Sequence, residues 1–171
     1  MVTSLTHAVD ARDADLERAY RAAADVPDPE IPVLTLVDLG VLRSVSRRGG
    51  EIVVALSPTY TGCPATAAII LAVEIALIDA GLANARVETV LSPAWTTDDI
   101  TEAGRAKLKD YGIAPPGKGS PALMFTDERV ACPRCGSEHT SRISEFGSTA
   151  CKALWRCDDC REPFDYFKCH R

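Results

Sequence analysis

The sequence predicts a small two-layer α+β domain followed by a short β-rich module that a metal ion holds together. In the first part of the 171-residue chain, apolar residues at helical spacing alternate with strand-like runs. In the last part, short β-rich stretches separate paired cysteines, and about 50 residues cannot bury much apolar core without a metal. We expect the α+β domain at residues 1–114, a linker at residues 115–130 and the metal-binding module at residues 131–171.

The individual elements follow from apolar spacing, turn residues and capping residues. Pro27 ends the first helix, Gly81 closes the second, and Thr97 caps the third. Gly49 and Gly50 join the first two strands as a hairpin. Helices are predicted at residues 11–24, 64–80 and 97–111, strands of the first domain at residues 41–45, 51–56 and 86–91, and strands of the module at residues 140–146, 153–156 and 164–168.

The composition excludes several classes of protein. Apolar residues make up 46% and charged residues 25%, which is typical of a folded domain. A net charge of −5 and an aromatic content of 6% do not fit a nucleic-acid binder, which needs positive charge and stacking surfaces. The most apolar run, residues 65–80, contains Glu74 and Asp79 and is too short and alanine-rich to span a bilayer. We therefore expect neither a nucleic-acid partner nor a membrane.

The seven cysteines are the unusual feature of the composition. An odd number cannot form a complete intrachain disulfide framework. Residues 1–20 lack the basic start and apolar stretch of a secretory signal. We therefore expect a cytoplasmic protein, whose cysteines serve metal binding or thiol chemistry.

Four of these cysteines have the spacing of a metal site. Two C-x-x-C pairs, Cys132 with Cys135 and Cys157 with Cys160, are separated by 21 residues, and Gly136 lets the backbone curl around the ion. Two such turns complete a tetrahedral shell, and because that shell is closed the metal is structural. Zinc is the metal we expect, although a rubredoxin-type iron uses the same ligands and the spacing leaves it open.

The fifth cysteine, Cys63, stands before a predicted helix. Pro64 suits the first helical position, so Cys63 is predicted to be the N-cap, where free N–H groups and the helix dipole stabilise a thiolate. Thr59 and Thr61 supply nearby hydroxyl groups. From these residues alone, an ordinary buried cysteine is an equally good interpretation.

Two further features are ambiguous when they are taken from the residues alone. Asp28 and Glu30 lie on a proline-rich turn; a helix-terminating surface turn is the favoured interpretation, and an iron-binding or cluster-transfer site is the alternative. The helix at residues 64–80 is apolar nearly all round, so its second face is predicted to meet another protein such as a second copy, or the third helix and the metal module.

Four residues of the C-terminal module have no assigned function. Cys151, Cys169 and His170 are interpreted as small buried side chains or tail residues, with a second thiol site as the alternative. His139 is interpreted as a surface or capping residue because it lies outside either cysteine pair.

Several motifs together resemble a known family. Residues 28–32 (DPEIP), 37–41 (VDLGV) and 59–64 (TYTGCP) resemble the iron–sulfur cluster assembly-like domain, a small α+β domain of cluster-maturation factors. Residues 91–98 (LSPAWTTD) and the tail 144–154 (SEFGSTACKAL) resemble its PaaD branch, whose members are encoded with phenylacetyl-CoA epoxidase, a multicomponent oxygenase. The resemblance extends over about residues 12–170.

The resemblance implies an accessory or maturation factor, not the catalytic subunit. It matches Cys63 to the reactive cysteine of the domain, and Asp28 and Glu30 to its acidic turn. It also implies a C-terminal zinc ribbon, a transient iron or iron–sulfur cargo, and a role in aerobic phenylacetate catabolism. The expected partners are epoxidase subunits, notably the iron–sulfur reductase or the diiron component, with a homodimer as a further possibility.

Three other functions remain to be weighed against maturation. A non-catalytic structural subunit of the oxygenase would use the apolar helix and the module as interfaces. A thiol enzyme based on Cys63 needs a histidine partner, but His7, His139 and His170 lie in the termini or the module. A nucleic-acid-binding ribbon is disfavoured because residues 121–171 hold equal numbers of basic and acidic side chains.

Overall fold

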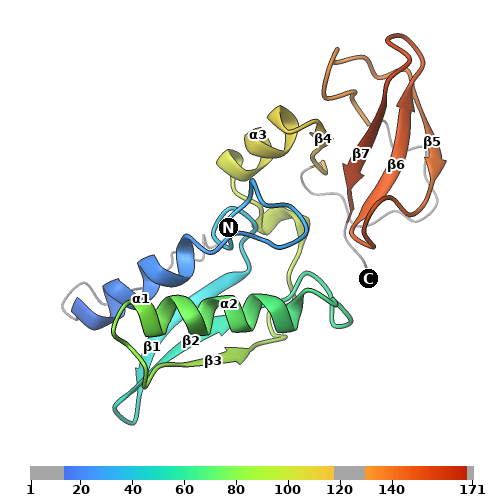
Figure 1. The fold of residues 1–171 in the computed structure, drawn as a ribbon. Helices are drawn as coiled ribbons and strands as arrows, with labels where there is room; N and C mark the ends of the chain where they lie inside the picture. The colour runs from blue at the N-terminus through green and yellow to red at the C-terminus, as the bar shows by residue number, and fades with distance from the viewer. Residues whose placement is uncertain (1–13, 118–129, 169–171) are drawn as a thin grey trace, which may run out of the picture. The chain divides into compact units, whose positions relative to one another are not determined.

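A computed structural model describes residues 14–117 and 130–168 of the chain. It divides into two compact units, Met1–Trp95 and Thr96–Arg171 (Figure 1). Among the described residues, the first unit holds a three-stranded sheet and the second holds a four-stranded sheet. The mixed α+β class predicted from the sequence is confirmed.

Within the described residues, no helix is long and apolar enough to cross a membrane.

The first unit combines a hairpin with a parallel crossover. Strands β1 and β2 pair antiparallel, and Gly49 and Gly50 both have positive φ (58° and 92°), as the tight two-residue turn between them requires. Strand β3 pairs parallel with β2 after the chain crosses through α2. The elements are α1 (Ala14–Ala24), β1 (Leu42–Arg48), β2 (Glu51–Leu56), α2 (Thr66–Asp79) and β3 (Arg86–Thr89).

Two helices cover the sheet of the first unit. Helix α1 contacts β1 and β2, and α2 contacts β3 and α1 (Figure 1). Five consecutive residues of β2, from Ile52 to Leu56, are buried, as expected for a central strand. The inward-facing residues of α2 are Ile69, Val73 and Leu77. These predicted helices and strands are confirmed, and residues 11–13 of the first predicted helix lie outside the described residues.

The segment between α1 and β1 is held by its own polar groups. The carboxylate of Asp38, which is buried, accepts hydrogen bonds from the Thr35 backbone N–H (2.9 Å) and hydroxyl (3.0 Å). The indole N–H of Trp95 donates to the carbonyl of Leu39 at 2.7 Å. This segment is therefore fixed against the unit's core and positions the Asp28 turn described below.

The second unit begins with two short helical elements where the sequence predicted one helix. Residue Ile100 is extended (φ −67°, ψ 125°) and its side chain is buried, so it interrupts the predicted helix at residues 97–111. Thr101 then starts a new helix, because its side chain accepts a hydrogen bond from the Gly104 N–H. The prediction of a single helix is wrong here. The elements are η1 (Thr97–Asp99) and α3 (Glu102–Asp110).

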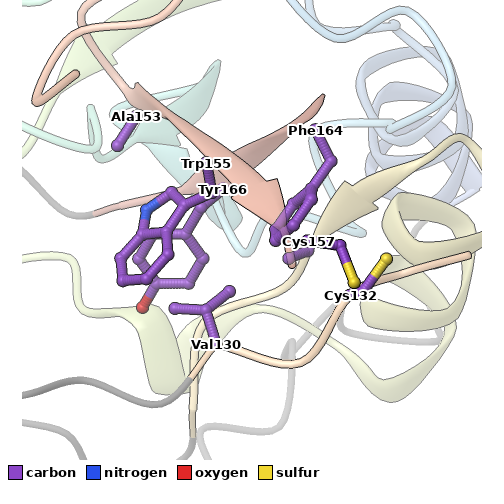
Figure 2. Close-up of a cluster of buried hydrophobic side chains, with 8 residues drawn as sticks. Val130, Cys132, Ala153, Trp155, Cys157, Phe164 and Tyr166 are labelled. Carbon is purple, nitrogen blue, oxygen red and sulfur yellow. The ribbon is translucent and has the colours of Figure 1, made fainter. Parts of the chain in front are cut away.

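Three of the four strands of the second unit, β5, β6 and β7, correspond to the strands predicted from the cysteine-rich tail. Strand β5 pairs antiparallel with β6, and β6 with β7. Eight buried side chains form its core, among them Trp155 and Tyr166, whose rings meet edge to face (Figure 2). The strands are β4 (Ile113–Ala114), β5 (Thr140–Ser144), β6 (Lys152–Cys157) and β7 (Pro163–Phe167).

The structure divides the chain at a different place from the predicted boundary at residue 114. Strand β4 pairs in parallel with β7, so residues 96–114 group with the C-terminal unit. Of the predicted linker at residues 115–130, residues 118–129 lie outside the described residues.

Candidate functional site

Each C-x-x-C pair lies in a turn with the same backbone hydrogen bond. The N–H of Cys132 donates to the carbonyl of Ser137 (2.8 Å), and the N–H of Cys157 donates to the carbonyl of Glu162 (3.0 Å). In both turns the bond joins the first cysteine to the residue five positions later. The two turns are therefore equivalent, and each presents two thiols from one tight loop.

The residue after each pair has a left-handed backbone. Gly136 has φ 76°, as its glycine predicts, and Arg161 at the equivalent place has φ 66°. A non-glycine residue with positive φ is uncommon. The sequence offered no signal for Arg161, since only the equivalence of the two turns identifies it.

The four sulfur atoms of the pairs converge from these two turns. Sγ of Cys132 lies 3.8 Å from Sγ of Cys160, Sγ of Cys135 lies 3.6 Å from Sγ of Cys157, and all four lie within 4.8 Å of one another. These distances are far longer than a disulfide bond of about 2.05 Å. A tetrahedral shell with Zn–S bonds of about 2.3 Å has S···S edges of about 3.8 Å. The donor set and its geometry therefore fit a tetrahedral metal ion.

Local hydrogen bonds favour the charged form of one thiol and one carboxyl group at this site, Cys157 and Asp159. Neighbouring thiols and burial instead raise the pKa of Cys135 and Cys160. The N–H of Cys160 donates to Sγ of Cys157 at 3.4 Å and lowers the pKa of that thiol to about 7. The hydroxyl of Ser137 donates to the carboxylate of Asp159 and, with His139, holds the pKa of that carboxyl below its usual range. Ser137 and Asp159 come from opposite turns, so this bond also links them.

The buried cluster of the second unit, drawn in Figure 2, includes residues of both C-x-x-C turns, which we call the metal turns. Cys132 and Cys157 are both buried there, and Figure 2 shows Cys157 beside Phe164. The turn of Cys157 and Cys160 joins β6 to β7, the two strands that carry the aromatic side chains of the core. We infer that the geometry of the thiols and the packing of the core depend on each other.

The remaining C-terminal residues are placed only in part. Cys151 is buried, and its Sγ lies 3.1 Å from Oγ1 of Thr149, which matches its interpretation as a small buried side chain. His139 is exposed, as predicted for a surface residue. Cys169 and His170 lie outside the described residues.

In the first unit, the structure brings Cys63 and Asp28 to one pocket. The two residues are far apart in the sequence, yet both line the same cavity beside the start of α2. Its wall combines a thiol, a carboxylate, threonine hydroxyl groups and apolar side chains. The other lining residues are Val41, Leu56, Pro58, Thr59, Thr66, Ile69 and Thr89.

The sequence predicts Cys63 as the N-cap of α2, and the structure shows that this prediction is wrong. The helix begins at Thr66 with Ala65 as its N-cap. The N–H of Thr66 donates to the carbonyl of Cys63 in a four-residue turn (3.2 Å), and the first helical bond runs from the N–H of Ile69 to the carbonyl of Ala65 (2.9 Å). Because Pro64 has no N–H, it joins the turn ahead of the helix. Cys63 is half-buried and lies in this turn, two residues before the N-cap.

Asp28 and Glu30 have different positions on their shared turn. Asp28 is 8% exposed, and its Oδ1 accepts hydrogen bonds from the backbone N–H groups of Glu30 (2.9 Å) and Ile31 (2.8 Å). This carboxylate therefore holds the turn together as well as lining the pocket. Glu30 is half-buried and is not among the residues that line it.

Comparisons with known proteins match each unit to a family model. An iron–sulfur cluster assembly protein model matches residues 16–91, and a PaaD zinc β-ribbon model matches residues 117–168. A domain of unknown function (DUF59) from Bacillus anthracis shares the fold, with a TM-score of 0.50 and 24% identity over 56% of this chain and 92% of that one. The class of protein is thus an iron–sulfur assembly-type domain joined to a zinc-ribbon-type module.

One curated relative narrows this class. The chain is 53% identical over 146 residues to a protein of Escherichia coli (strain K12) that is named as the putative D component of 1,2-phenylacetyl-CoA epoxidase. The match covers 85% of this chain and 88% of the relative. The chain belongs to the PaaD-like family of phenylacetyl-CoA epoxidase subunits.

Proposed function

We propose that this chain is a cytoplasmic, non-catalytic accessory factor that helps the phenylacetyl-CoA epoxidase acquire an iron–sulfur or iron centre during aerobic phenylacetate catabolism. The clients are epoxidase subunits, notably the iron–sulfur reductase or the diiron component. The observation that carries the proposal is the pocket shared by Cys63 and Asp28 in a domain that matches iron–sulfur assembly proteins.

The chemistry of the pocket suits temporary binding of iron. The thiolate of Cys63 is a soft ligand that iron and iron–sulfur clusters accept, and the carboxylate of Asp28 is a harder one. Two dissimilar ligands from different segments hold a cargo less completely than a four-cysteine shell does. Glu30, which is half-buried on the same turn, is the third proposed ligand.

The four-cysteine site has a separate, structural task in this proposal. Cys132, Cys135, Cys157 and Cys160 hold zinc in a closed shell. Zinc, when bound, supplies a fixed link between the two turns and no position for a substrate. In this proposal the zinc ion stabilises the C-terminal module, and the pocket of the first unit binds the cargo.

The test measures the iron and sulfide content of the client when it is produced with the unaltered chain or with variants that lack a proposed ligand. Cys63→Ser and Asp28→Asn are expected to fold and retain zinc, but to leave a co-produced reductase short of iron and sulfide. Asp25→Asn is the matched carboxylate control, because Asp25 is exposed directly after α1 and does not line the pocket. Full cluster content in the reductase produced with Cys63→Ser would contradict the proposal.

A non-catalytic structural subunit is the second candidate function. The observation that favours it is the exposed apolar surface of α2, described below. Copurification with the catalytic subunits at fixed stoichiometry, together with a dispensable Cys63, would select this function over maturation.

A further inference from the structure

Helix α2 has a second apolar stripe on the face opposite the core. Leu71, Ile75 and Ile78 are 58%, 51% and 58% exposed. They follow one another at four- and three-residue spacing, so they lie along one line of the helix surface. At 100° per residue this line is opposite the buried stripe of Val73 and Leu77. The helix therefore presents one apolar face to the sheet and a second one to solvent.

Acidic residues flank the exposed stripe on both sides. At helical spacing, Glu74 lies on one side of it and Asp79 on the other, and both are exposed. Neither carboxylate has an ion pair or side-chain hydrogen bond within the part of the chain that the structure describes. The helix contains no lysine or arginine between Thr66 and Asp79. The surface is thus an apolar ridge with an uncompensated negative rim.

We propose that this stripe docks a segment of a client protein that presents an apolar ridge flanked by lysine or arginine. Flanking charges of opposite sign select partner and orientation when apolar helix faces pair. A second copy of the chain does not meet this requirement. A two-fold pairing of the stripe would bring together two copies of the same negative rim, with no cation on either helix to offset Glu74 and Asp79.

The docking stripe and the cargo pocket lie on different faces of the same helix. Thr66 and Ile69 line the pocket at the start of α2. At 1.5 Å rise per residue, Leu71 lies only about 8 Å further along the axis than Thr66. A client bound to the stripe is therefore held close to Cys63 without covering the side of the helix that lines the pocket.

The experiment measures binding of the full-length, zinc-loaded chain to the purified reductase and diiron components by calorimetry at low and high salt. The inference rests on the proposed function only in the choice of these probes. The variant Ile75→Ser/Ile78→Ser should weaken binding about tenfold or more. The variant Glu74→Lys/Asp79→Lys should weaken it similarly and remove its salt dependence. Ile143→Ser, on a residue 54% exposed in β5, is the matched control and should bind normally.

Three results would overturn the inference. The first is an unchanged affinity in both stripe variants. The second is that neither the reductase nor the diiron component binds the unaltered chain. The third is that the unaltered chain is a dimer and the Ile75→Ser/Ile78→Ser variant is a monomer. The outcome is separable from that of the proposed function. If Cys63→Ser supports full cluster content while the stripe variants lose binding, the docking site stands and the maturation role falls.

Discussion

The residue that follows each cysteine pair shows how two different sequences build the same turn. Gly136 and Arg161 occupy equivalent left-handed positions, although only the first is glycine. A left-handed backbone costs a residue with a side chain roughly 1–2 kcal/mol. A Cβ at Gly136 would meet nothing within 4 Å, so this backbone term is the only penalty for a side chain there.

We predict opposite effects of matched substitutions at these positions. Gly136→Ala should lower the free energy of unfolding by about 1 kcal/mol. Arg161→Gly should raise it by about 0.5 kcal/mol, since relief of strain exceeds the added entropy of the unfolded glycine. Denaturant unfolding of the zinc-loaded protein measures both. Equal stability of Gly136→Ala and the unaltered protein would show that the turn is not held in this conformation.

The hydrogen bond between the two metal turns predicts a pH effect. The pKa of the Asp159 carboxyl is lowered from 3.8, first by the Ser137 hydroxyl and also by His139. Because the folded-state pKa is depressed, the contribution to stability is present above about pH 3.8 and is lost as the pH falls through the folded value. Ser137→Ala should therefore raise the pKa of Asp159, as measured by NMR titration. An unchanged titration would exclude the bond.

At the scale of elements, Thr101 decides where α3 begins. Its side chain accepts the Gly104 N–H at 2.9 Å, directly after the extended Ile100. Replacing a threonine cap with alanine costs about 1 kcal/mol, so Thr101→Ala should lower stability by that amount in denaturant unfolding. Thr61→Ala, at an exposed turn position, is the control and should change little. Equal effects of the two substitutions would contradict the capping role.

Local patterns predicted elements where local chemistry decides them. The glycine pair fixed the β1–β2 hairpin, and the apolar run of β2 identified a buried strand. The capping residues of the third helix fit both a single helix and one that is interrupted at Ile100, so the sequence predicts the simpler form. Only burial of the Ile100 side chain distinguishes the two possibilities. Strand β4 is two residues long and exists through its pairing with β7, so its own sequence holds no signal.

The two candidate sites also differ in whether local sequence or the tertiary fold brings their residues together. The four-cysteine site was predictable because each pair is local and the chemistry needs only two such turns. The meeting of Cys63 with Asp28 depends on how the segment between α1 and β1 folds back on the sheet, which no spacing reveals. The family resemblance supplied that pairing of residues, and the residues alone left it open.

At the scale of the whole molecule, the two units differ in how their cores are held. The first unit has a continuous core under two helices, including all of β2 after Glu51. The second has an eight-residue cluster in which two members, Cys132 and Cys157, are also proposed metal ligands. A core this small gains much of its stability from metal binding, because binding energy at a structural site is folding energy.

Removal of the metal should therefore unfold one unit and spare the other. In the zinc-loaded protein, a strong chelator should abolish amide-exchange protection in β6 and β7 while β2 remains protected, because the ligands of the second unit also anchor its core. Replacement of Cys157 and Cys160 by serine should reproduce this state without chelator. Retention of protection in β6 and β7 in both experiments would show that packing of Trp155 and Tyr166 suffices, and that the four thiols are not structural ligands. Loss of protection in β2 as well would show that the two units fold as one, so the independence of the cargo pocket from the metal turns would have to be abandoned.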